Sequence, residues 1–196
     1  MRIAALASHG GSILQAVIDA CQQGDLQAEV VLVISNNSGA EALARAHRCG
    51  IPTLHLSSAT HADDRALDEA MAAALAESGA DWVLLAGYMK KLGPRVLAAY
   101  RDRIVNTHPA LLPKYGGRGY YGRRVHEAVL AAGERESGAS VHLVTDEYDA
   151  GPVIAQARVP VRSGDRVEDL ENRVKDAERA LIVATLQRLA DQPALD

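Results

Sequence analysis

Residues 30–34 read Val30-Val31-Leu32-Val33-Ile34, an uninterrupted run of aliphatic side chains. A run without polar alternation predicts a strand that is covered on both faces, as in a parallel sheet with helices on either side. The turn Ser35-Asn36-Asn37-Ser38-Gly39 follows, and residues 40–49 continue with helical spacing. This order of strand, turn and helix is the unit from which α/β folds are built.

The same alternation extends in both directions along the chain. Before the run we expect a strand at residues 3–7 and a helix at 12–21, with Ser12 as its N-cap. After it we expect strands following Pro52 and at 82–86, 104–106, 138–145 and 153–160, and helices at 63–78, 94–100, 125–132 and 167–189. The sequence therefore predicts an α/β fold: a Rossmann-like, mostly parallel sheet with helices on both faces, and an antiparallel strand pair near the C-terminus. We expect one domain over residues 1–196.

The composition of the chain indicates which kinds of ligand, partner and compartment to expect. The formal net charge is −4, so we expect no nucleic-acid partner, because such proteins normally carry a basic surplus. No apolar run is long enough to cross a membrane, and we expect small-molecule substrates and a monomer or homodimer. Cys21 and Cys49 lack the spacing of metal ligands. They are expected to be free thiols in a reducing, cytoplasmic compartment.

Four segments follow the carboxyl ends of predicted strands, where open α/β sheets bind their ligands. The first is Ser8-His9-Gly10-Gly11-Ser12. Its glycines and the helix N-terminus are typical of a phosphate site. A tight turn with a serine cap explains the same residues equally well. The second segment spans residues 87–92.

The third segment is Asn106-Thr107-His108-Pro109, at the end of a strand. Alternation along a strand directs Asn106 and His108 to the same face, which suits a catalytic amide and imidazole, although a structural histidine is the other interpretation. Leu112-Pro113 is a candidate cis peptide, because the chain must turn sharply there.

In the fourth segment, a strand containing His142 runs into Asp146, Glu147 and Asp149. This is either a solvated acidic turn or a carboxylate that is directed at His108. A metal site made of His108, His126, His142 and Asp149 is not favoured, since no H-x-x-x-H or C-x-x-C spacing is present.

Taken together, two long motifs carry a resemblance to a known family. They are Asn106-Thr107-His108-Pro109-Ala110-Leu111-Leu112-Pro113 and Gly138-Ala139-Ser140-Val141-His142 through Asp149-Ala150-Gly151-Pro152. The chain resembles the glycinamide ribonucleotide formyltransferase family over nearly its whole length. The resemblance implies an enzyme of purine biosynthesis that transfers a formyl group directly from 10-formyltetrahydrofolate, its co-substrate, to the amine of glycinamide ribonucleotide, without a metal.

The resemblance also implies roles for individual residues. Catalysis falls to Asn106, His108 and Asp149, and His142 orients Asp149 from behind. The ribonucleotide is expected at Gly10, Gly11, Ser12, Ile13, His126, Lys175 and Glu178. The folate is expected at Met89, Lys90, Leu92, Thr145, Asp146 and Asp149. Because both ligands are anionic, local positive charge is expected from Lys90, Lys91, Lys114, Arg118, Arg123 and Arg124.

Two departures from the family pattern bear on the acceptor. Ile13 stands where the family usually has Asn, and the loop at residues 116–124 is longer and more basic than usual. The alternatives are therefore a formyl-folate transferase acting on another amine, such as a sugar nucleotide or methionyl-tRNA, and a formyltetrahydrofolate hydrolase. The tRNA enzymes and the hydrolases carry extra domains for which we expect no room in this chain. A non-catalytic, dinucleotide-binding Rossmann module is disfavoured, because G-x-G-x-x-G is absent.

Overall fold

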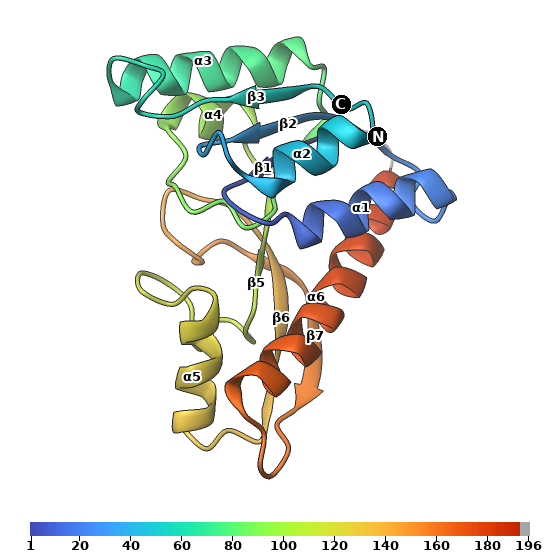
Figure 1. The fold of residues 1–196 in the computed structure, drawn as a ribbon, viewed down its shortest axis with the longest axis vertical. Helices are drawn as coiled ribbons and strands as arrows, with labels where there is room; N and C mark the ends of the chain where they lie inside the picture. Colours follow the sequence, from blue (N-terminus) through green and yellow to red (C-terminus); the bar gives the residue numbers. More distant parts are fainter. Residues whose placement is uncertain (193–196) are drawn as a thin grey trace.

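The computed structural model of the protein describes residues 1–192, and its centre is a seven-stranded sheet in the order β3-β2-β1-β4-β5-β6-β7 (Figure 1). The strands are β1 Arg2–Ala7, β2 Glu29–Ser35, β3 Thr53–His55, β4 Trp82–Leu85, β5 Ile104–His108, β6 Glu136–Leu143 and β7 Val153–Pro160. Strands β3 to β5 in this order pair in parallel. β6 pairs antiparallel with both β5 and β7. The predicted fold class is confirmed.

Helices cover both faces of the sheet. They are α1 Ser12–Gln23, α2 Glu41–Arg48, α3 Asp64–Glu77, α4 Pro94–Ala99, α5 Arg123–Ala131 and α6 Val167–Ala190. Along β1, Ile3 and Ala5 belong to a buried cluster with residues of α1 and α6. The alternate residues Ala4 and Leu6 belong to a cluster with residues of α3 and α4. Both faces of this strand are apolar because both are covered, as the sequence predicted.

The antiparallel end of the sheet has a core of its own. Leu170 and Val174 of α6 pack with Val129 of α5 and with Ala139 and Val159 of the sheet. Figure 1 shows α6 running alongside β6 and β7 and reaching α1. This long helix thereby joins the two halves of the molecule.

The strand order places a crevice at the centre of the sheet. From β1 the chain proceeds to β2 and β3 on one side, and it then returns to β4 and β5 on the other. The segments that leave the carboxyl ends of β1 and β4 therefore diverge, and ligands bind at such switch points.

The start of α1 differs from the prediction that Ser12 is its N-cap. Ser12 is the first helical residue, and the cap position is held by Gly11, in the left-handed conformation with φ 69° and without a side-chain cap. A Cβ atom at Gly11 would lie 2.8 Å from the Cβ atom of Ala42. Close packing against α2 and the positive φ require glycine here, which an argument from serine capping alone did not consider.

Other local predictions have mixed outcomes. The peptide bond Leu112-Pro113 is cis, as predicted. Cys21 and Cys49 are free, but both are only partly buried. Within residues 1–192, no helix is long and apolar enough to cross a membrane.

Candidate active site

One cavity of about 940 Å³ opens at the carboxyl ends of β1, β4 and β5. Its walls come from the three segments that follow these strands, from the loop before α5, from the β6–β7 connection and from α6. All the residues assigned to the catalytic trio, to its partner His142, to the ribonucleotide or to the folate line this cavity: Gly10, Gly11, Ser12, Ile13, Met89, Lys90, Leu92, Asn106, His108, His126, His142, Thr145, Asp146, Asp149, Lys175 and Glu178. A large cavity with several converging polar groups is the natural candidate for an active site.

His108 lies at the end of β5, buried to 4% exposure. Its Nε2 atom is 2.6 Å from the backbone oxygen of Tyr115, and its Nδ1 atom is 3.4 Å from Oδ2 of Asp149. The carbonyl oxygen can only accept, so Nε2 carries a proton, and in the neutral ring Nδ1 faces the carboxylate with a lone pair. Burial lowers the pKa of His108, and the opposing effects of Asp149 and the Tyr115 carbonyl do not reverse this. Asp149 does favour the protonated form of His108, as its charge predicts, but desolvation outweighs this effect and the pKa falls.

His142 lies next to both Asn106 and Asp149, the two members of the predicted catalytic trio other than His108. Its Nδ1 atom lies 2.9 Å from the backbone oxygen of Leu143, so this nitrogen donates. The Nε2 atom is 3.0 Å from Nδ2 of Asn106 and 3.4 Å from Oδ1 of Asp149. A neutral His142 with its proton on Nδ1 accepts a hydrogen bond from the Asn106 amide. His142 therefore orients Asn106 as well as lying beside Asp149.

Asp149 adopts φ 54°, which is uncommon outside glycine, and its Oδ2 atom accepts a hydrogen bond from the backbone N–H of Gly117 at 2.9 Å. Burial alone would raise the pKa of Asp149. His142 and His108, in the forms that present a proton to the carboxylate, and the Gly117 bond together outweigh burial and lower the pKa. The carboxylate is thus charged near neutral pH and available to a proton or a cation.

The carbonyl groups of the turn between β1 and α1 are occupied by hydrogen bonds. The oxygen of His9 accepts from the N–H of Ala42, that of Gly10 from Nε of Arg45, and that of Gly11 from the N–H of Gln15. The N–H groups of the first helical turn have no partner within a helix. Such a turn offers its N–H groups to an anion at the positive end of the helix dipole.

Three predicted residues approach this turn from the other side of the cavity. Glu178 is buried, and burial raises its pKa. Lys175, one turn earlier on α6, forms an ion pair with Glu171 at 2.6 Å. His126 is also buried, which lowers its pKa, and its Nδ1 atom has no hydrogen-bond partner among the described residues. An unsatisfied buried nitrogen in a cavity wall is a group that a ligand can pair with.

The expected positive charge is only partly gathered at the cavity. Lys90, Lys91 and Arg118 line it. Lys114 instead pairs with Glu134 at 2.8 Å, Arg123 pairs with Glu127 and Glu168, and Arg124 lies over the ring of Tyr121. These last three were predicted because both ligands are anionic, but in the structure each has an acidic or aromatic partner and does not line the cavity.

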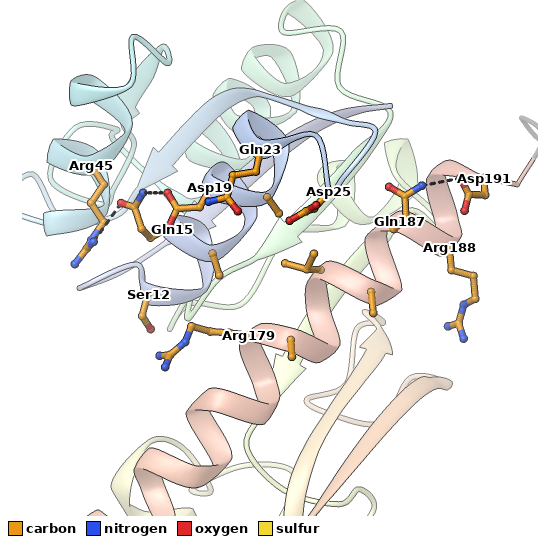
Figure 2. A pocket seen from close by; sticks show the side chains of 15 residues that line it. Ser12, Gln15, Asp19, Gln23, Asp25, Arg45, Arg179, Gln187, Arg188 and Asp191 are labelled. Atoms are coloured by element: carbon orange, nitrogen blue, oxygen red, sulfur yellow. Dashed lines mark hydrogen bonds between the residues drawn. The ribbon is translucent and has the colours of Figure 1, made fainter.

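A second hollow, of about 930 Å³, lies between α1 and α6 (Figure 2). It shares only Ser12 and Arg45 with the cavity described above. Figure 2 shows Arg45 bonded to Gln15, and Gln15 bonded to Asp19, along its edge. It contains none of the predicted trio, so the candidate active site is the cavity at the strand ends. Across residues 1–192 there is also no group of three His, Cys, Asp or Glu side chains that could hold a metal ion.

Comparison with known proteins shows the family to which the chain belongs. The family model described as "Formyl transferase" matches residues 1–186.

The chain belongs to the formyl transferase family.

Within the formyl transferase family, the phosphoribosylglycinamide formyltransferase of Escherichia coli is 40% identical over 191 residues, which cover 97% of this chain and 88% of that protein. Among solved structures, glycinamide ribonucleotide transformylase 1 from Symbiobacterium toebii superposes with a TM-score of 0.91 at 38% identity, covering 97% of this chain and 88% of that one. A formyltetrahydrofolate deformylase from Pseudomonas syringae gives a TM-score of 0.85 at 25% identity, and only 63% of that chain is covered. The relatives named for the ribonucleotide are therefore closer than the deformylase.

Some residues of this formyl transferase site were missed from the sequence. Tyr115 and Gly117 contact His108 and Asp149 through their backbones. The glycine-rich loop that contains Gly117 was the available signal. Arg45 lines the cavity from α2, and nothing in its helical context distinguishes it from a surface arginine.

Proposed function

We propose that this chain transfers the formyl group of 10-formyltetrahydrofolate to the amine of glycinamide ribonucleotide, a step of purine biosynthesis. The observation that carries the proposal is the contact network of Asn106, His108, His142 and Asp149 inside the one cavity that also contains the anion-binding turn. The family and the identity to phosphoribosylglycinamide formyltransferases over almost the whole chain support the same reaction.

The acceptor is assigned to the turn and α6. The phosphate accepts hydrogen bonds from the N–H groups at Gly11, Ser12 and Ile13, and Lys175 supplies charge from the opposite wall. These are backbone donors, so replacing the family's Asn by Ile13 removes a side chain without removing the N–H groups. Glu178 and His126 then face the ribose and the glycinamide portion.

The donor is assigned to the segments after β4 and β6. Gly87, with φ 74°, turns the chain away from β4, and Met89, Lys90 and Leu92 follow along the cavity wall. The pteridine lies along this backbone and against the connection at Thr145 and Asp146. The exposed Lys90 and Lys91 suit the carboxylates of the folate tail.

The reaction begins when the acceptor amine attacks the formyl carbon and negative charge develops on the formyl oxygen. Asn106 donates one amide N–H to His142 and has a second one for this oxygen. Neutral His108 has no free N–H for this oxygen, because Nε2 donates to the Tyr115 carbonyl and Nδ1 presents a lone pair; it becomes the second donor once Nδ1 is protonated. Prepositioned donors of this kind contribute about 3 to 4 kcal/mol each to the stabilisation of an oxyanion.

The contacts of His108 also define a place for the proton that the amine loses. In the neutral ring, the lone pair of Nδ1 faces Oδ2 of Asp149 at 3.4 Å, so this pair of groups has room for one more proton. The attacking amine gives up that proton to Asp149 and His108. The proton then passes to the folate nitrogen as the bond from that nitrogen to the formyl carbon breaks. The step balances: a C–N bond to the amine replaces the C–N bond to the folate, and the proton lost by the amine becomes the N–H of tetrahydrofolate.

The compartment and the assembly state stay predictions. The free thiols Cys21 and Cys49 suit a reducing compartment such as the cytoplasm. A monomer or a homodimer is expected.

A turnover assay with 10-formyltetrahydrofolate, with and without glycinamide ribonucleotide, tests the proposal. Tetrahydrofolate formed only when the ribonucleotide is present supports it. Product formed without the ribonucleotide identifies a hydrolase, and folate binding without turnover identifies another acceptor amine. His108→Asn is the matched variant: an enzyme loses most of its rate, whereas a binding module keeps its affinity for folate.

A further inference from the structure

Three neighbouring strands of the sheet, β2, β1 and β4, are connected at their carboxyl ends by one hydroxyl group. Oγ of Ser8, just after β1, lies 2.6 Å from Oδ1 of Asn36, just after β2, and it donates to this amide oxygen. The same Oγ atom accepts a hydrogen bond from the backbone N–H of Met89 at 2.8 Å, in the segment after β4. The backbone N–H of Ser8 donates to the oxygen of Gly87 at 3.2 Å.

These bonds hold the segment after β4 at two points. Gly87 is held through its oxygen and Met89 through its N–H, both by the same residue. Two attachments fix the direction of a short segment as well as its distance. Ser8 is 1% exposed and does not line the cavity, so its hydroxyl has no part in contacting a substrate.

Ser8 links two segments that line the cavity, so its hydrogen bonds fix the position of one segment relative to the other. The residue immediately precedes the turn at 9–13, and its partner Met89 begins the segment at 89–92. Under the proposed function the first segment binds the acceptor phosphate and the second binds the folate. A shift between them changes the distance from the attacking amine to the formyl carbon, and misplacement of about 1 Å costs on the order of 100-fold in rate.

We propose that Ser8 is a positioning residue that fixes the donor segment relative to the acceptor turn, so that its hydroxyl group sets both folate affinity and the alignment of the two substrates. This inference rests on the proposed function for the assignment of the two segments. Alanine at position 8 leaves the N–H of Met89 without its acceptor. The loss of one such bond corresponds to about a tenfold change in affinity.

Three variants test the inference. Ser8→Ala removes the hydroxyl, and Ser8→Thr keeps it while adding a methyl group in a tightly packed place. Ser57→Ala is the matched control, since Ser57 is also buried and its Oγ atom also accepts a hydrogen bond from a backbone N–H, that of Ala59, but the residue lies outside the cavity. For each protein we would measure KM for both substrates, kcat, and the melting temperature.

The expected result separates positioning from stability. Ser8→Ala raises KM for 10-formyltetrahydrofolate about tenfold and lowers kcat, while KM for the ribonucleotide changes by less than about threefold. Ser8→Thr keeps KM close to that of the wild type even if its melting temperature falls. Ser57→Ala changes only the melting temperature. An unchanged folate KM in Ser8→Ala overturns the inference, as does an equal rise in Ser57→Ala.

A direct titration with tetrahydrofolate distinguishes failure of this inference from failure of the proposed function. If wild-type protein shows no turnover with glycinamide ribonucleotide, the proposed function fails, but the titration still compares folate affinity between wild type and Ser8→Ala. A tenfold weaker affinity in the variant supports the role of Ser8. Equal affinities, or no folate binding by either protein, refute it.

Discussion

Replacing Gly11 by alanine is the sharpest test of the acceptor turn. Gly11 has φ 69°, where an L-residue pays about 1 to 2 kcal/mol. The added Cβ atom would also lie 2.8 Å from the Cβ atom of Ala42, and such overpacking costs about 1 to 3 kcal/mol. Together the two effects destabilise the native turn by about 2 to 5 kcal/mol, and the protein avoids this cost either by unfolding or by moving the turn. For a chain of this size the melting temperature should fall on the order of 10 °C.

The neighbouring Gly10 provides a control within the same turn. A Cβ atom there meets nothing within 4 Å, and its φ is not in the left-handed region. Gly10→Ala should therefore behave like the wild type, whereas Gly11→Ala should raise KM for the ribonucleotide at least about tenfold, because the N–H donors move. Steady-state kinetics with the ribonucleotide varied at saturating folate would measure this. Equal KM values for Gly11→Ala and the wild type would refute the reasoning.

Two further variants address the chemistry and the buried acid. Asp149→Asn should retain its backbone, since asparagine tolerates φ 54°, and should lower kcat about 10²- to 10⁴-fold; a rate within threefold of the wild type would contradict a proton-transfer role. The lowered pKa of Asp149 stabilises the wild-type fold above the ordinary pKa of 3.8, and this stabilisation disappears as the pH falls through the lowered pKa. Asp149→Asn should lack this stabilisation, which unfolding measured at pH 2 to 6 would detect. Glu178→Gln should be more stable than the wild type at pH 8 and equal to it below about pH 4, because burial raises the pKa of Glu178 above 4.5 and its charged form destabilises the fold; its KM for the ribonucleotide should rise. A thermal shift that does not depend on pH would contradict the assignment of that destabilisation to the charge.

The sheet and its order of elements were predictable because the signals are local. The run at 30–34 and the helical spacing after it depend on nearest neighbours, and the structure has these elements within a few residues of the predicted bounds. The cap of α1 was not predictable in this way. Serine is a good cap in general, but the contact between Gly11 and Ala42 depends on how α2 packs, which the sequence around residue 12 does not contain.

The site shows the same division between local and tertiary information. Side chains with chemical character, such as Asn106, His108 and Asp149, attract attention in a sequence. Backbone partners such as Tyr115 do not, because every residue has a carbonyl group. The lowered pKa of His108 likewise depends on burial, which outweighs a charge that the sequence makes visible. Nor does any rule of composition show that Lys114 turns toward Glu134 rather than the cavity.

The position of α6 has a consequence for the nascent chain. The helix carries Lys175 and Glu178 to a cavity whose first wall is the turn at residues 9–13, so the wall is completed by groups more than 160 residues apart. While the ribosome still holds residues 167–190, the wall of the cavity that α6 provides is missing. Under the proposed function, the ribonucleotide site is complete only after α6 has been synthesised. Acceptor affinity therefore depends on α6, whereas the segments assigned to folate, at 87–92 and 145–149, both precede that helix in the chain.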